Sequence, residues 1–259
     1  MSGRENPHLI SDAAFDAVIF DMDGVITDTV RLHEAAWKRL FDEFLSTQHS
    51  DEVDVRLFSP DDYRRDVDGR ARIDGVETFL ASRGVKLPRG DPHDTPDTVT
   101  VWGLANHKND YFLEAAASEG VEAIASSVAF VARARALGLR TALVTASRNR
   151  SAILRASGTD SLFDAHVDGD DAAAMGLAGK PAPDMFVEAA RRLGIEPARA
   201  VVVEDALAGV EAARRGGFGL VVGLDRSGLL AGALQAHGAD VVVADLGTLI
   251  RGGEAEEQA

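Results

Sequence analysis

Two aspartates, Asp21 and Asp23, directly follow a short apolar run and are the residues of this chain best placed to do chemistry. The run, residues 15–20, is predicted to form a buried strand. Side chains two positions apart on an extended backbone point the same way, so both carboxylates would face one site, and Gly24 frees the chain to turn away after them. Crowded carboxylates repel each other unless a cation or a proton lies with them. The pattern predicts a site for a hard metal ion and a phosphate, with one carboxylate to attack and the other to move protons.

Three further groups of polar residues follow later apolar runs, and they are Thr145-Ala146-Ser147, Lys180 and Glu204-Asp205. The threonine hydroxyl and the two backbone N–H groups after it would hold phosphate oxygens at the start of a loop. The lysine precedes a proline that fixes its backbone, and an ammonium group presented in this way suits a phosphate. The two acids would share a Mg²⁺ ion with the first aspartate. Each feature alone also fits a helix cap, a solvated turn or a surface lysine, but together they favour a phosphate site.

The elements that position these residues fall into two patterns. From residue 125 onward, predicted helices at residues 125–137, 151–157, 183–193 and 206–215 alternate with predicted strands. The strands are expected at residues 139–144, 165–167, 200–203, 220–222 and 241–243. This alternation predicts an α/β fold, a Rossmann-like parallel sheet covered by helices on both faces.

The segment between the first strand and residue 125 shows helical patterns without a strong strand signal. Helices are predicted at residues 29–44, 74–83 and 103–118, separated by polar, loop-like segments at residues 46–62 and 86–100. We therefore predict an all-helical cap domain at residues 29–120, inserted into a core of residues 1–28 and 121–251. The insertion follows the carboxyl end of a strand, where open α/β sheets bind ligands. Residues 252–259 are predicted to be a disordered tail.

The composition restricts the classes of function. The formal net charge of −15 over 259 residues argues against general binding to nucleic acid or to an anionic membrane. The absence of cysteine excludes disulfides, zinc–thiolate sites and a cysteine nucleophile. No apolar run is long enough to span a bilayer, and no hydrophobic signal region begins the chain. We expect a monomeric, cytoplasmic protein that concentrates a few cations around an anionic substrate.

The four motifs resemble the signature of the haloacid dehalogenase superfamily of phosphotransferases, and they span nearly the whole core. The resemblance implies that Asp21 is the nucleophile that becomes an aspartyl-phosphate. It implies that Asp23 is the general acid/base and that its backbone carbonyl helps to hold Mg²⁺. By the same resemblance the phosphoryl group is bound by Thr145 and Lys180, and the metal site is completed by Glu204 and Asp205.

Residues 20–41, together with Gly69-Arg70-Ala71-Arg72 and Lys108-Asn109-Asp110-Tyr111, resemble the β-phosphoglucomutase-like subgroup. This resemblance implies that Arg72 binds the non-transferring phosphate and that Lys108 binds the sugar side of the cap. It places His33 and Trp37 at the cleft between cap and core, with His33 positioning Asp23. In the core it assigns phosphate support to Asn149. The chain departs from the subgroup at Thr145 and Arg148, where serine and lysine are common, and in its longer cap loops, which puts the substrate in doubt.

Three functions remain open at this point. The first is a Mg²⁺-dependent mutase that interconverts β-glucose 1-phosphate and glucose 6-phosphate through a bisphosphate. The second is a phosphatase of the same fold that acts on a small sugar phosphate or a related metabolite. The third is a non-catalytic phosphate-binding regulator, which the intact set of Asp21, Asp23, Lys180 and Asp205 disfavours because a pure binder needs no nucleophile. All three predict a small phosphorylated metabolite as ligand, and the mutase predicts a hexose phosphate.

Overall fold

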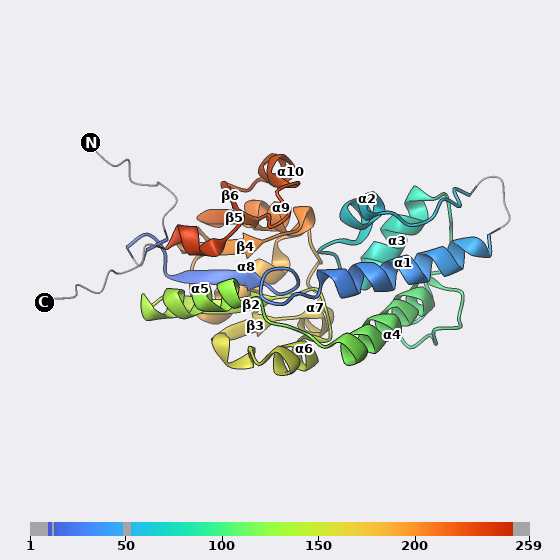
Figure 1. Ribbon diagram of the computed structural model, residues 1–259, viewed down its shortest axis with the longest axis horizontal. Coiled ribbons are helices and arrows are strands. Elements are labelled where there is room, and N and C mark those ends of the chain that lie inside the picture. The colour runs from blue at the N-terminus through green and yellow to red at the C-terminus, as the bar shows by residue number, and fades with distance from the viewer. Residues whose placement is uncertain (1–9, 12, 49–52, 251–259) are drawn as a thin grey trace, which may run out of the picture.

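Six parallel strands form one sheet in the order β3-β2-β1-β4-β5-β6 in the computed structural model, which describes residues 10–11, 13–48 and 53–250 (Figure 1). The strands are β1 (Ala17–Asp21), β2 (Arg140–Val144), β3 (Ala165–Val167), β4 (Ala200–Glu204), β5 (Leu220–Leu224) and β6 (Val241–Val243). The first strand lies in the middle, with β2 on one side and β4 on the other. All carboxyl ends therefore meet at one edge of the sheet, as the predicted α/β fold class requires.

Helices cover both faces of this sheet. They are α5 (Ala125–Ala136), α6 (Arg150–Ser157), α7 (Gly169–Met175), α8 (Asp184–Leu193), α9 (Leu207–Arg215) and α10 (Ala231–His237), and short helical turns lie at Asp160–Leu162, Pro197–Arg199 and Leu246–Leu249. Alternate residues of β1 enter different hydrophobic cores. Val18 and Phe20 pack in the core that includes α5 and α6, whereas Ala17 and Ile19 pack in the core that includes α8 and α9. A strand buried on both faces needs a continuous apolar run, which explains the composition of β1.

The segment between β1 and α5 forms a helical cap beside the carboxyl edge of the sheet (Figure 1). Its helices are α1 (Val30–Ser46), α2 (Pro60–Asp62), a π-helical turn at Tyr63–Val67, α3 (Arg72–Ser82) and α4 (Val101–Glu119). These helices share a third hydrophobic core that centres on Phe41. The Phe41 ring stacks on Phe79 with centroids 3.8 Å apart and on Trp37 with centroids 5.2 Å apart. The cap thus carries a core of its own, which suits an independent covering element.

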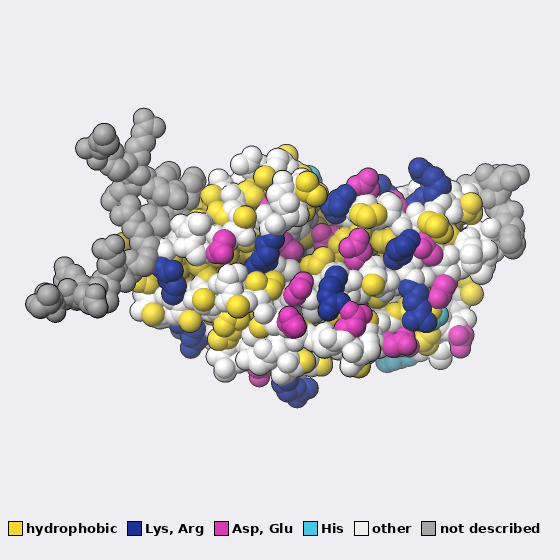
Figure 2. Space-filling view, viewed as in Figure 1, with side chains coloured by type: hydrophobic (Ala, Val, Ile, Leu, Met, Phe, Trp, Pro, Cys, Tyr) yellow, Lys and Arg dark blue, Asp and Glu magenta, His cyan; other side chains and the backbone are white. Residues whose placement is uncertain are grey.

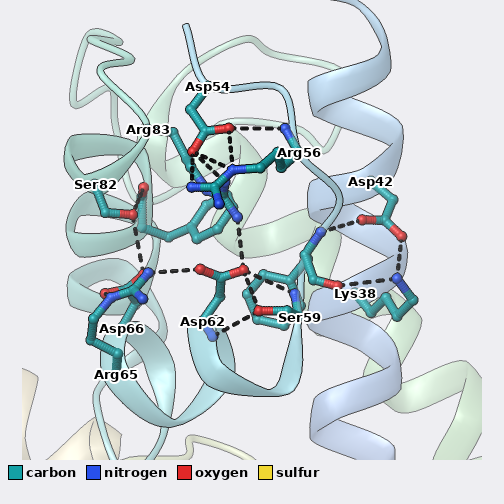
Figure 3. A network of polar contacts seen from close by, with 12 residues as sticks. Lys38, Asp42, Asp54, Arg56, Ser59, Asp62, Arg65, Asp66, Ser82 and Arg83 are labelled. Carbon is teal, nitrogen blue, oxygen red and sulfur yellow. Dashed lines mark hydrogen bonds and ion pairs between the residues drawn. The ribbon is translucent and has the colours of Figure 1, made fainter.

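A network of buried charges ties the α2 segment to α3 (Figure 3). The Arg83 guanidinium, whose side chain is only 4% exposed, contacts Asp54 at 2.8 Å and Asp62 at 2.7 Å. Arg65 bridges Asp62 and Asp66 at 2.7 Å each. Because buried charges are costly when unpaired, this network fixes the conformation of the segment that leads toward the site.

The visible outer face of the cap is strongly charged. Figure 2 shows positive and negative side chains interspersed over the cap helices. Among them, Lys38 pairs with Asp42 at 2.7 Å within α1, and Arg39 of α1 pairs with Glu114 of α4 at 3.0 Å. No helix within the described parts of the chain combines the length and the apolar composition that a bilayer crossing requires.

Several predicted elements need correction. The loop predicted at residues 46–62 ends in α2, because Ser59 and Asp62 form a capping box that starts a helix at Pro60. The prediction also missed α7 and α10, which have seven residues each and are too short for a clear periodic pattern. Other helix ends moved by one or two residues, as at Arg72, where α3 begins. The boundaries of the cap at residues 29–120 remain a prediction, and the predicted tail lies outside the described residues.

Candidate active site

The predicted motifs meet at the carboxyl edge of the sheet because neighbouring strands end side by side there. The register pairs Asp21 with Val144, so the loop that begins at Thr145 starts beside the first aspartate. A cavity of about 650 Å³ separates this edge from the cap. Eleven of the residues predicted from sequence line it, namely Asp21, Asp23, His33, Trp37, Arg72, Lys108, Thr145, Ala146, Ser147, Asn149 and Asp205. Lys180 and Glu204 do not line it and lie beneath its floor.

Lys180 joins the acids at the centre of the site. Its side chain is 1% exposed, and its Nζ contacts Asp21 Oδ1 and, at 2.5 Å, Glu204 Oε1. Burial lowers the pKa of Lys180, but attraction to both carboxylates outweighs that effect and holds its pKa above the usual value. The ammonium therefore stays charged beside Asp21 and Glu204. The second oxygen of Glu204, Oε2, accepts the backbone N–H of Ala206 at 2.8 Å, so both oxygens of this carboxylate already have partners.

Asp21, Glu204 and Asp205 form a compact acidic cluster. Each offers a carboxylate oxygen, and these oxygens lie within 4.8 Å of one another. Burial raises the pKa of Asp21 and of Asp205, and repulsion from Glu204 raises both further. A further positive charge beside Asp21 and Asp205 would favour their ionised forms. The donor set consists of oxygens only, which fits a hard divalent cation such as Mg²⁺.

Gly24 leaves the space that the cluster needs. Its φ is +79°, and a Cβ at this position would lie 1.9 Å from Asp205 Oδ2. An alanine would therefore suffer both an unfavourable backbone conformation and a clash with a proposed metal ligand. The glycine of the aspartate motif is required by this close approach as well as by the turn.

The Asp23 carboxylate points to different partners. It accepts hydrogen bonds from Thr29 at 2.5 Å and from Thr145 at 3.3 Å, and its Oδ1 lies 3.3 Å from His33 Nε2. Burial alone would raise the pKa of Asp23. The charge of His33, the hydrogen bonds from His33 and Thr29, and the charge of Lys108 outweigh burial and lower that pKa to about 2. Two neighbouring aspartates thus have opposite shifts, because Asp21 is buried among other carboxylates whereas Asp23 is held by cationic and hydrogen-bonding partners.

Lys108 of α4 lies behind His33 of α1. Its Nζ is 2.6 Å from His33 Nδ1, and it lies 4.9 Å from the centre of the Trp37 ring. Burial lowers the pKa of Lys108 to about 7, and Arg72 contributes to the decrease while Asp23 opposes it. A cap lysine, a cap histidine and the core aspartate therefore form a continuous polar chain.

Arg72 and Asn149 both line the cavity, and each is hydrogen-bonded to an asparagine of α4. The Arg72 guanidinium donates to Asn106 Oδ1 at 3.2 Å, while its buried Nε has no partner among the residues that the structure describes. Asn149 Nδ2 donates to Asn109 Oδ1 of α4 at 2.9 Å. Asn149 therefore holds the cap against the core in addition to lining the cavity, a contact that its predicted phosphate role does not include.

The lining residues that sequence reasoning did not select include Asp68, Arg70, Trp102 and Arg89. Asp68 directly precedes the motif of residues 69–72, and Arg70 lies within it. Their proximity to the site could therefore have been predicted from the sequence. Arg89 comes from the polar segment 86–100, where no pattern distinguishes a lining residue from a surface charge. Its place is fixed by a 2.7 Å ion pair with Glu77 of α3.

A parallel sheet with an acidic cluster and a buried lysine at its carboxyl edge, covered by a helical insertion, defines a phosphotransferase of the α/β class. The sequence profile of the haloacid dehalogenase-like hydrolase family matches residues 15–217. The chain belongs to this family, as its motifs predicted, and it is an enzyme of the phosphotransferase and phosphatase type.

Individual relatives carry more specific names. The chain is 43% identical over 238 residues to a beta-phosphoglucomutase of Mycobacterium bovis, covering 90% of this chain and 91% of that protein. It is 43% identical over 129 residues to a trehalose-phosphate phosphatase of Mycobacterium leprae, covering 48% of this chain and 28% of that protein. Its fold matches a crystal structure of beta-phosphoglucomutase from Clostridium difficile with a TM-score of 0.69 and 22% identity, covering 91% and 93% of the two chains.

Proposed function

We propose that this enzyme is a Mg²⁺-dependent β-phosphoglucomutase that transfers a phosphoryl group through an aspartyl-phosphate at Asp21. Its substrates would be β-glucose 1-phosphate and glucose 6-phosphate. The observation that carries the proposal is that one cation contacts Asp21 of the core while another, from the cap, lines the same cavity as Asp21. The first is Lys180, and the second is Arg72, whose buried Nε has no partner among the described residues. A bisphosphate intermediate needs both, because either phosphate takes the place of the other during turnover.

The first half-reaction follows from the positions of Asp21 and Lys180. A carboxylate oxygen of Asp21 attacks phosphorus, and the bond from phosphorus to the leaving oxygen breaks. Lys180 neutralises charge that would otherwise repel the attacking carboxylate from the phosphate. Asp21, Glu204 and Asp205, with the Asp23 carbonyl, would hold Mg²⁺, which supplies further neutralisation of the phosphoryl oxygens. Thr145 and the backbone N–H groups of Ala146 and Ser147 would bind those oxygens.

Asp23 would act as the general acid/base. As an ionised carboxylate it would first take the proton from the sugar hydroxyl that attacks the aspartyl-phosphate, and it would return that proton to the leaving oxygen when Asp21 attacks the other phosphate. Its carboxylate is held by Thr29 of the cap boundary and by His33 of α1. Docking of the cap therefore sets the environment of this group and excludes water from the aspartyl-phosphate.

A product assay tests the proposal. The enzyme is incubated with Mg²⁺, β-glucose 1-phosphate and a trace of the 1,6-bisphosphate, and glucose 6-phosphate and inorganic phosphate are both measured. We expect glucose 6-phosphate without a matching release of inorganic phosphate. Inorganic phosphate as the only product would replace the mutase with a phosphatase.

The phosphatase remains the second candidate because of a specific likeness. Half of the chain is as similar to a named trehalose-phosphate phosphatase as nearly the whole chain is to the mutase. The two activities share Asp21, Asp23 and the metal site, and they differ in whether water or a sugar hydroxyl takes the phosphoryl group. A small phosphorylated sugar is the proposed ligand in both cases.

A further inference from the structure

Asp68 brings a carboxylate from the cap to the acidic cluster of the core. It follows the π-helical turn of the cap and lines the cavity together with Asp21, Asp23 and Asp205. A second cavity of about 570 Å³ lies on the other side of the junction between cap and core, and Asp68 and Asp205 line that cavity too. These two carboxyl groups therefore lie where cap and core come closest, between the two cavities.

The backbone beside Asp68 is docked tightly on the core. Gly69 has a φ of +69°, and a Cβ added there would lie 2.9 Å from the Cβ of Ala206, the residue after Asp205. In this structure the cap backbone at residues 68–69 thus packs directly on the core backbone that follows Asp205. This packing defines the closed cap, in which Asp68 lies beside Asp205.

The charges at this junction are unbalanced. The core contributes four acids, Asp21, Asp23, Glu204 and Asp205. Lys180 contacts two of them, and His33 and Lys108 lie beside Asp23. Arg226 lines the second cavity with Asp205, so among the described residues Lys180 and Arg226 are the cations near the proposed metal ligands. Asp68 lines both cavities with Asp205, so its carboxylate lies on the side of the cap that faces these acids. Closing the cap adds one more carboxylate to this group, which is unfavourable unless a cation offsets it.

We propose that Asp68 couples cap closure to binding of the divalent cation, with the cap carboxylate interacting with the cation site in the closed state alone. This inference rests on the proposed metal site at Asp21, Glu204 and Asp205. Without a cation, repulsion between Asp68 and the core acids favours the open cap. With a cation bound, the same carboxylate favours the closed cap. The coupling is reciprocal, so closure must raise the affinity for the cation by the factor by which the cation favours closure.

The test measures cation binding and cap closure without measuring activity. Mg²⁺ affinity is determined by titration calorimetry for the wild type and for Asp68→Asn. Closure is followed by distances between spin labels at Leu57→Cys in the cap and Leu137→Cys in the core, two exposed positions in a chain without other cysteines. In the wild type we expect Mg²⁺ to shift the distances toward the closed form. In Asp68→Asn we expect about tenfold weaker Mg²⁺ binding and distances that do not respond to Mg²⁺.

Asp74→Asn is the matched control. Asp74 is another cap carboxyl group that lines the same cavity, but the charges that act on it are those of Arg89 and Arg70 rather than the core acids. It should keep the Mg²⁺ affinity and the Mg²⁺-dependent closure of the wild type. Unchanged affinity and closure in Asp68→Asn would overturn the coupling while leaving the metal site intact. Failure of the wild type to bind Mg²⁺ would instead remove the metal site and the coupling with it.

Discussion

His33 Nε2 of cap helix α1 lies 3.3 Å from Asp23 Oδ1 in the loop after β1. This contact joins the cap to the proposed acid/base of the core. Because Lys108 of α4 lies 2.6 Å behind the same histidine, both long helices of the cap contribute to the environment of Asp23. The position of the cap therefore determines the charges around a group that must gain and lose a proton.

Lys108 should make stability depend on pH. Burial lowers its pKa to about 7 in the folded protein, whereas an exposed lysine has a pKa of about 10.4. Between these values the unfolded chain binds a proton that the folded chain does not, so this group makes the free energy of unfolding rise with pH. We expect the free energy of unfolding of Lys108→Met to rise less steeply with pH than that of the wild type, as measured by urea unfolding at pH 7, 8 and 9. The exposed control Lys38→Met should keep the wild-type slope, and an equal slope for Lys108→Met would contradict the assignment.

Arg72→Ala should lower sugar-phosphate turnover without preventing phosphorylation of Asp21. Removing a buried guanidinium that binds phosphate costs about 2–5 kcal/mol, so mutase turnover should fall at least about 30-fold. Phosphorylation of Asp21 by acetyl phosphate, which does not reach the cap, should continue. Arg64→Ala is the control, since Arg64 pairs with Asp61 at 2.5 Å and does not line the main cavity. Unchanged sugar-phosphate turnover in Arg72→Ala would favour the phosphatase.

Asp205→Ala should weaken Mg²⁺ binding and activity together. Its carboxylate belongs to the three-acid cluster and has no competing contact with Lys180, unlike Asp21 and Glu204. We expect the Mg²⁺ dissociation constant from calorimetry to rise at least about tenfold. Chelation of the wild type should abolish activity, and Mg²⁺ should restore it. Full activity after exhaustive chelation would show that the cluster serves another purpose.

The buried network of the cap predicts a large effect on stability. Arg83→Met removes the buried partner of Asp54 and Asp62, and because these carboxylates keep Arg56 and Arg65, we expect a loss of about 1.5–3 kcal/mol, as for hydrogen bonds to charged groups. Arg56→Met removes a guanidinium that also pairs with Asp54 but has a side chain that is 84% exposed, so it should change stability by less than about 0.5 kcal/mol. Urea unfolding of both variants measures the difference. Equal effects would mean that burial does not determine the contribution of these ion pairs.

Most of the core site could be predicted from the sequence because parallel strands impose its geometry. Asp21, Thr145 and Glu204 each follow an apolar run, and strands with a common direction bring such ends together. The pairing of Lys180 with Glu204 could not be predicted, because it depends on how the loop before α8 folds under the sheet edge. Each oxygen of Glu204 therefore already accepts one hydrogen bond, and binding of Mg²⁺ there would use a remaining lone pair.

The cap was less predictable for a physical reason. The contribution of Asp68 and Arg89 depends on how the cap packs against the core, and this long-range contact leaves no periodic signal. The π-helical turn that leads to Asp68 follows α2, which begins at the capping box of Ser59 and Asp62. These two residues could be recognised in the sequence, but they lie in a polar stretch that was predicted to be a loop. Local propensity therefore identified the long helices, while the short connecting elements that aim side chains into the cavity emerged only from the structure.

The central claim is that Asp21 carries the phosphoryl group, and the most direct measurement is detection of that group on the protein. The enzyme is mixed with Mg²⁺ and acetyl phosphate, quenched in acid and digested, and the peptide that contains Asp21 is examined by mass spectrometry. We expect one added phosphoryl group on this peptide in the wild type. The Asp21→Asn variant should show none and should lose turnover while keeping its fold, because an amide does not attack phosphorus. A phosphoryl group on another residue, or wild-type turnover in folded Asp21→Asn, would contradict the account.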